Sequence, residues 1–253
     1  MIIGWWRSYC GPAPGADDWV SQWNGDPVLL VALGVSAFAM TQLPGVRRMA
    51  GLAGVAVLFV AFVSPLCALT TALFSARAVH HLLLVTVAAP LFAIALPLRR
   101  AIGMAVTTSI ALPLSTAVLW AWHAPALYDA ALSHVGIYWV MQATLFASGW
   151  LFWTAVLRAR PAEAAAGIIG GAVQMGFLGA LLTFAGRPLY AAHLSTTVAF
   201  GMGPLADQQL AGLVMWVPGM APYAAAAAWI ATRRWKAMTL DRPAHGRANG
   251  ASA

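Results

Sequence analysis

Seven long runs without a charged residue constrain this chain more than any other feature. The runs are Val28 to Val46, Met49 to Ala76, Ala78 to Leu98, Ala101 to Trp122, Val135 to Leu157, Ala164 to Gly186 and Gln208 to Thr232. A helix rises about 1.5 Å per residue, so about 20 apolar residues cross the roughly 30 Å hydrocarbon core of a bilayer. Each run is near or above that length, and only 8% of the 253 residues are charged. We therefore predict an all-α integral membrane protein, a bundle of seven transmembrane helices.

The runs divide the chain into three parts. Residues 1–27 place four tryptophans among Gly, Pro and Asp, a pattern typical of an interfacial arm with aromatic anchors. Residues 28–236 form the predicted membrane domain. Residues 237–253 have no apolar periodicity, and we expect a disordered tail. The second run is longer than one crossing, and Ser64, Pro65 and Cys67 predict that its last part bends out of the membrane.

The basic residues predict which side each connection faces. Eleven lysines and arginines lie in the connections that share a side with the C-terminus, against three (Arg7, Arg77 and Arg187) on the other side. By the positive-inside rule, the N-terminal arm is outside, in the periplasm, and the C-terminal tail is cytoplasmic. The net charge of +7 therefore reflects membrane topology. We expect the membrane lipid as a partner of the chain, and no nucleic acid.

Sequence motifs give no indication of an enzyme. The chain has no Walker loop, HExxH, GxSxG or CxxCH pattern. Its carboxylates lie at the edges of the runs, which disfavours a proton-driven transporter. We expect a protein that is not an enzyme.

Most potential metal ligands share the predicted outer face. His80 and His81 lie at the outer end of the third helix, and we expect at most one of two adjacent imidazoles to face the bundle interior. His123 and His134 flank a short segment that carries Tyr128 and Asp129. Imidazoles bind copper, zinc and haem iron, but histidines hydrogen-bonded at an interface and an outer cap over the bundle explain the same pattern.

Asp207, Gln208 and Gln209 stand at the mouth of the last helix. An acid complements a helix N-terminus and amides cap its free N–H groups. The same trio could instead be one wall of a site. The two cysteines, Cys10 and Cys67, also fall on the outer side, where they could form a disulfide in an oxidising periplasm. Alternatively, Cys67 is a thiolate ligand beside His80 or His81.

Four segments resemble those of the CtaG-like cytochrome c oxidase assembly factors of bacteria. They are FSARAVHHLLLVTVAAPL (74–91), WHAPALYDAAL (122–132), LFWTAVL (151–157) and PLADQQLAGLVMWVPG (204–219). The order and spacing match over roughly residues 23–236. The resemblance implies a seven-helix protein of the bacterial inner membrane that helps mature a haem-copper oxidase, at the copper-insertion stage, without being an enzyme.

The resemblance also suggests which residues act. The polar positions shared with the family fall on His81, His123, His134, Asp207 and Gln208. We predict a transient copper site of His81, His123 and His134, with His80 and Cys67 as further ligands. Asp207, Gln208, Tyr128 and Asp129 would orient the ligands. The implied partners are oxidase subunits and a periplasmic copper donor.

The chain departs from the family pattern at three positions, and at one of them Cys67 follows SPL where an acid is expected. Arg77 stands where a first histidine of an HMxxH pattern is expected, and Tyr138 stands where a second histidine often follows His134. Histidines at i and i+4 would share one helical face and clamp a metal, so both clamps are halved here. The alternative function is therefore a metal-free accessory or scaffold subunit of a respiratory complex. Copper import is a third reading and is least supported, because few polar residues lie at the bilayer centre.

Overall fold

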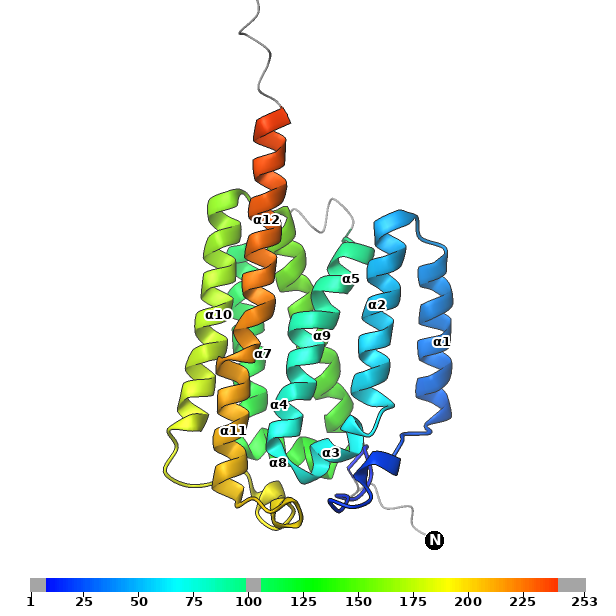
Figure 1. The fold of residues 1–253 in the computed structure, drawn as a ribbon, viewed down its shortest axis with the longest axis vertical. Coiled ribbons are helices and arrows are strands. Elements are labelled where there is room, and N and C mark those ends of the chain that lie inside the picture. The colour runs from blue at the N-terminus through cyan, green and yellow to red at the C-terminus, as the bar shows by residue number, and fades with distance from the viewer. Residues whose placement is uncertain (1–7, 99–105, 241–253) are drawn as a thin grey trace, which may run out of the picture.

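The computed structural model describes residues 8–98 and 106–240, and the described part is helical throughout, without strands. Most helices run along one axis and form a bundle (Figure 1). The helices are α1 (Pro27–Thr41), α2 (Gly45–Phe62), α3 (Leu66–Ala72), α4 (Phe74–Leu82), the π-helical η2 (Leu83–Ala88), α5 (Ala89–Ala95), α7 (Thr108–His123), α8 (Pro125–Ser133), α9 (Val135–Arg158), α10 (Pro161–Thr183), α11 (Pro204–Trp216) and α12 (Ala221–Leu240). Short 3₁₀ turns are η1 (Trp19–Ser21), η3 (Ala191–His193), η4 (Thr197–Phe200) and η5 (Pro218–Met220).

Five helical segments in the described part are long and apolar enough to cross a membrane. They are Gly45–Phe62, Phe74–Ala95, Val135–Arg158, Pro161–Thr183 and Pro204–Arg233. A sixth crossing results if α7 and α8, which meet at a 71° bend, are one broken span, whereas α1 is apolar but has only 15 residues. The class of multi-pass helical membrane protein is confirmed. The count of seven crossings stays a prediction.

The helix boundaries follow from prolines and side-chain caps. The Asp26 carboxylate accepts hydrogen bonds from the N–H groups of Val28 and Leu29, and Pro27 occupies the first helical position of α1. The long second run ends as a helix at Phe62 and turns through Ser64 and Pro65 into α3. The predicted break in the run is confirmed, and its direction out of the membrane stays a prediction. The next span begins at Phe74, four residues before the predicted Ala78.

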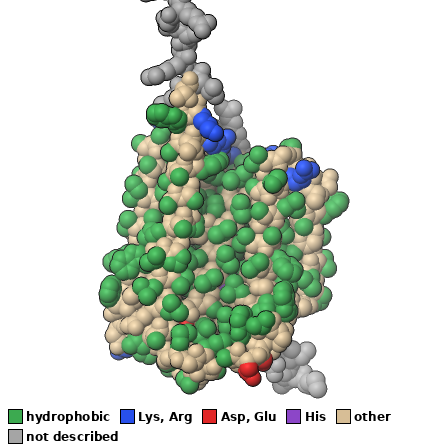
Figure 2. Space-filling view, in the orientation of Figure 1, with side chains coloured by type: hydrophobic (Ala, Val, Ile, Leu, Met, Phe, Trp, Pro, Cys, Tyr) green, Lys and Arg blue, Asp and Glu red, His purple; other side chains and the backbone are tan. Residues whose placement is uncertain are grey.

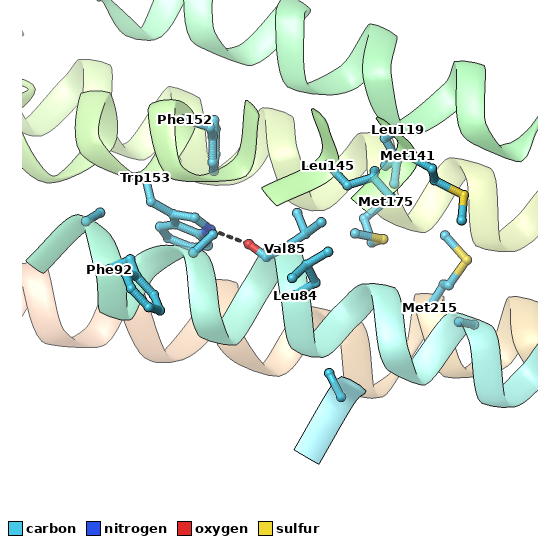
Figure 3. Close-up of a cluster of buried hydrophobic side chains, with 14 of the residues drawn as sticks. Leu84, Val85, Phe92, Leu119, Met141, Leu145, Phe152, Trp153, Met175 and Met215 are labelled. Atoms are coloured by element: carbon cyan, nitrogen blue, oxygen red, sulfur yellow. Dashed lines mark hydrogen bonds between the residues drawn. The ribbon is translucent and has the colours of Figure 1, made fainter. Parts of the chain in front are cut away.

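The span that follows is continuous but not uniformly α-helical. It passes from α4 through the π-helical η2 into α5, where Pro90 cannot donate a backbone hydrogen bond. Figure 3 shows the indole of Trp153, on α9, donating to the Val85 carbonyl in η2, at 2.9 Å. Around this bond, Leu84, Leu145 and Met175 pack into the main core of the bundle.

The last span differs from the prediction at both ends. It begins at Pro204 instead of Gln208, is interrupted by η5 at Pro218, and continues in α12 to Leu240. Residues 237–240, predicted to belong to a disordered tail, are therefore helical; the remainder of that predicted tail, 241–253, lies outside the described residues, as do residues 1–7 of the arm.

The two ends of the bundle differ in composition. We call one the arm end: residues 8–26, α3, α8 and the connection 184–203 gather there (Figure 1). The opposite end, the arginine end, carries Arg47, Arg48, Arg158, Arg160 and Arg233; basic side chains are visible there in Figure 2. The end-to-end separation of charge matches the sequence pattern. The assignment of the arm end to the periplasm stays a prediction.

Candidate functional site

The N-terminal arm is fastened across the arm end. A disulfide joins Cys10 to Cys67 at the start of α3. The Tyr9 hydroxyl donates to Asp26 at 2.6 Å, a bond that lowers the pKa of that carboxyl, and the Tyr9 ring stacks on Tyr138 of α9 at 5.1 Å between centroids. The sulfur of Cys67 is therefore part of a disulfide, and the prediction of Cys67 as a thiolate metal ligand is wrong for this structure.

Asp207 caps a helix other than its own. Its carboxylate accepts the N–H of Phe74 at 2.6 Å, the N–H of Ser75 at 3.2 Å and the Ser75 hydroxyl at 2.5 Å. These donors are the first N–H groups of α4, which lack intrahelical partners, and a negative charge there is favourable. Asp207 is fully buried. The prediction that Asp207 caps the last helix is wrong, because the helix that it caps is α4. None of these hydrogen bonds joins Asp207 to an imidazole.

The helix that Asp207 caps carries the polar centre of the molecule. Arg77, His80 and His81 on α4 are all buried, with exposed fractions of 0%, 0% and 4%. Neither of the adjacent histidines faces lipid headgroups. His80 contacts Phe62 of α2, with ring centroids 4.9 Å apart, and His81 contacts His123 of α7, so each faces a neighbouring helix. Arg77, which the sequence analysis counted in an outer connection, lies inside this span.

Three imidazoles form a row inside the bundle. The ring centroids of His80 and His81 are 5.9 Å apart, and those of His81 and His123, from α7, are 5.7 Å apart. Nδ1 of His123 lies 2.7 Å from the Leu119 carbonyl, which requires Nδ1 to be protonated and leaves Nε2 as the ring's lone-pair nitrogen. His81 and His123 come from helices far apart in sequence, a juxtaposition that hydropathy does not predict.

Unsatisfied polar atoms concentrate at this row. Of the fourteen buried side-chain nitrogen and oxygen atoms without a hydrogen-bond partner in the described part, eight belong to Arg77, His80, His81 and Gln142. Buried polar groups in native proteins nearly always have partners, which are protein, ordered water or ligand. Electrostatic contacts also link several of these groups, because His80 interacts with Gln142 and the Ala61 backbone and Arg77 interacts with Tyr128 and Tyr138. The row therefore lies in a connected polar centre that keeps hydrogen-bonding capacity to spare.

Arg77 places a fixed positive charge beside the row. Its Nη2 donates to the Thr70 carbonyl at 3.4 Å and its Cζ lies 5.4 Å from the centroid of the Tyr138 ring. Its Nε and Nη1 make no hydrogen bond of standard geometry in the described part, and the guanidinium also interacts with the Tyr128 and Tyr138 side chains. A buried charge without a paired opposite charge is costly. The aromatic face of Tyr138 offers only partial compensation.

A layer of aromatic side chains closes the arm end over this centre. The Tyr128 hydroxyl lies 2.7 Å from Nε2 of His193, whose Nδ1 lies 3.3 Å from the Ala72 carbonyl. Tyr190 donates to the His123 carbonyl at 2.9 Å and stacks on Phe74 with centroids 4.0 Å apart. Burial, reinforced by the charge of Arg77, lowers the pKa of His193 to about 4, so this imidazole is neutral at pH 7.

The remaining predicted polar residues hold the connection between α10 and α11. Gln208 accepts the N–H of Leu189 at 2.7 Å and donates to the Arg187 carbonyl at 3.3 Å. The Asp129 carboxylate accepts the N–H groups of Ala191 and Ala192, both at 3.3 Å. These residues hold backbone groups of the connection, and their bonds account for both polar side chains without a direct role at the imidazoles.

The predicted ligand set is brought together only in part. His80, His81 and His123 are neighbours, whereas His134 is the N-cap residue of α9 and its side chain makes no capping hydrogen bond. No group of three or more His, Cys, Asp or Glu in the described part has an arrangement that could hold a metal ion. The sequence placed Arg77 in an outer connection and did not single out Gln142, so neither residue was expected at the site. A lone arginine beside two histidines at a helix start was the available signal for the first.

Comparison with known families decides the relationship of this chain. Residues 30–237 match the family described as cytochrome c oxidase caa3 assembly factor (Caa3_CtaG). The chain belongs to this family. The match covers nearly the whole helical bundle and every buried histidine. The resemblance to CtaG-like assembly factors that the four sequence segments indicated is therefore confirmed. No curated protein and no solved structure matches the chain.

Proposed function

We propose that this assembly factor assists copper insertion into a haem-copper cytochrome c oxidase, acting from the periplasmic face of the bacterial inner membrane. Copper is the cargo, held for a short time by His81 and His123 with His80 beside them. Its partners are oxidase subunits and a periplasmic copper donor. The protein does not itself catalyse a reaction in this proposal.

The observation that carries the proposal is the row of buried imidazoles with unpartnered nitrogens. Two imidazoles that bind one metal ion at about 2.0 Å have ring centroids about 5 to 6 Å apart, and the spacing of His81 and His123 is 5.7 Å. Imidazole nitrogens are suitable ligands for copper. Two ligands and a neighbouring third make a weak site, which suits a metal that must be handed on.

A scaffold function is supported by a different observation. The described residues contain no complete three-ligand group, and Arg77 brings a positive charge to the place where a cation would bind. A metal-free accessory subunit would use the shape of the bundle, and the unpartnered atoms around Arg77 would be completed by ordered water.

Copper binding by the purified protein separates the two functions. We expect the wild type to bind Cu(I) stoichiometrically and the His81→Ala, His123→Ala double variant to lose more than about tenfold in affinity, since changes to ligand surroundings alone cost 10- to 100-fold. The matched control is His134→Ala, which removes a histidine from the same end but outside the row and should bind copper as the wild type does. Folded protein that binds no copper in any form contradicts the proposal and favours the scaffold.

A further inference from the structure

A hollow of about 680 Å³ opens at the arginine end, between α2, α5, α9 and α12. Its apolar wall includes Met49, Leu91 and Ile94, and Trp229 of α12 forms the opposite side. The volume falls in the range of about 300 to 1,000 Å³ typical of small-molecule sites. None of the three imidazoles of the row lines this hollow.

Two arginines stand at the hollow and give it a positive charge. Arg233 lies over the Trp229 ring, with Cζ 4.7 Å from the centroid, and Arg158 donates one hydrogen bond to the Leu98 carbonyl. Both side chains are exposed, so each retains N–H donors for a ligand. Glu163, at the start of α10, is the one acid at this end among the described residues, and it does not line the hollow. The charge therefore fits an anion.

The walls of the hollow are open toward the lipid. Val46 and Met49 are 76% and 71% exposed, and in a membrane protein such apolar faces meet hydrocarbon chains. The span of α11 and α12 is the least covered of the five candidate crossings, with 17% of its apolar window buried. In Figure 2 basic side chains appear at the upper part of α12 and at the upper right of the molecule, both at this end. An occupant with acyl chains would cover the wall that protein leaves open.

We propose that the hollow binds one anionic phospholipid of the inner, cytoplasmic leaflet. Guanidinium groups form charge-assisted, bidentate hydrogen bonds with phosphate, so Arg158 and Arg233 bind the headgroup. Trp229 lies at headgroup level, where indole rings are favoured, and the acyl chains lie on Met49, Leu91 and Ile94. Basic pockets between helices at a cytoplasmic surface bind anionic headgroups by the same physics. The lipid fastens α12 to the rest of the bundle.

Native mass spectrometry with defined lipids tests the site. The purified full chain is given equimolar phosphatidylglycerol and phosphatidylcholine in detergent, and the lipids that remain bound are counted. We expect one retained phosphatidylglycerol and a preference of at least about tenfold, since two basic residues attract the net negative charge of this lipid, whereas phosphatidylcholine carries no net charge. The double variant R158Q/R233Q should lose the preference. The single variant R233Q, which keeps the Arg158 bond to Leu98, should reduce it in the same direction.

The matched control removes the same charge outside the hollow. R160Q/K236Q changes two exposed basic residues at the same end that do not line it, and it should keep the wild-type preference. Equal loss in both double variants, or no loss in either, overturns the proposal, because binding would then follow net surface charge or apolar contact. Inorganic phosphate is the second arm. Competition by phosphate at the lipid's own concentration would contradict a lipid site and indicate a phosphate site.

Discussion

Among single residues, Asp207 lies on α11 but stabilises the start of a different helix, α4. It is a fully buried carboxylate, and its three hydrogen bonds all go to the start of another helix. A buried carboxylate is tolerated when charge-assisted hydrogen bonds and a helix dipole replace its hydration. Asp207 therefore acts on the imidazole row indirectly, by holding the helix that carries His80 and His81.

Replacing Asp207 by alanine leaves the N–H groups of Phe74 and Ser75 buried without acceptors. We expect a loss of about 2 to 3 kcal/mol of stability, in line with hydrogen bonds to charged groups, measured as thermal or denaturant unfolding in detergent. Gln209→Ala is the control, because Gln209 is a neighbouring half-buried polar residue. Equal losses in the two variants would refute the capping role.

His193 predicts how stability changes with pH. Its folded pKa of about 4 is below the unfolded value near 6.5, so the unfolded state binds the proton first as pH falls. Stability is complete above pH 6.5 and declines as pH falls from 6.5 to 4, by at most about 3 kcal/mol from this residue. We expect His193→Gln to flatten the slope of melting temperature against pH in this window.

The control for that slope is Thr196→Val. Thr196 donates to the same Ala72 carbonyl at 2.7 Å but does not titrate, so its loss should lower stability by a similar amount at every pH. A slope that is unchanged in His193→Gln would show that other groups produce the pH dependence.

Among elements, α3 joins the arm to the span of the imidazole row. The disulfide from Cys10 closes a loop with a sequence separation of 57 residues, and the Asn24 side chain donates to the Phe62 carbonyl at 3.0 Å just before α3. A cross-link over a loop of this length stabilises by about 4 kcal/mol in the chain-entropy description. The arm is therefore part of the folded unit.

Reduction of the disulfide should loosen the arm end selectively. We expect a reductant to lower the melting temperature of the wild type and to increase hydrogen exchange in residues 8–26 and α3, while α10 is unaffected. The Cys10→Ser, Cys67→Ser variant should already be destabilised and should not respond to the reductant. A wild type that melts alike with and without reductant would mean that the cross-link does not stabilise the fold.

At the scale of the whole molecule, the sequence was sufficient to predict a helical membrane protein. It was not sufficient to predict which residues of different helices come into contact. Long apolar runs and the prolines that interrupt them can be read directly from the order of residues. The helical membrane class and the break at Ser64 and Pro65 could therefore be predicted. Contacts between helices depend on how they pack, so the meeting of His81 with His123 and the reach of Asp207 to α4 could not. Apolar run length also misplaced the third helix, because Arg77 is tolerated inside a span once it is buried.

The same limit explains the histidines. The sequence placed His80, His81, His123 and His134 at one end. The structure gathers the first three into a row, leaves His134 at a helix start and uses His193 as a hydrogen-bonded closure. A shared face is a property of spacing along the chain. A shared site depends on which helices become neighbours, and hydropathy carries no information about that.

The cap on α4 also sets an order of events during synthesis. The ribosome delivers α4 early and Asp207 more than 120 residues later, so the helix with His80 and His81 enters the membrane before its terminal N–H groups have an acceptor. Chains that stop before the final span keep those groups unmatched. The helix that carries His80 and His81 therefore gains its cap only when translation has reached the last crossing.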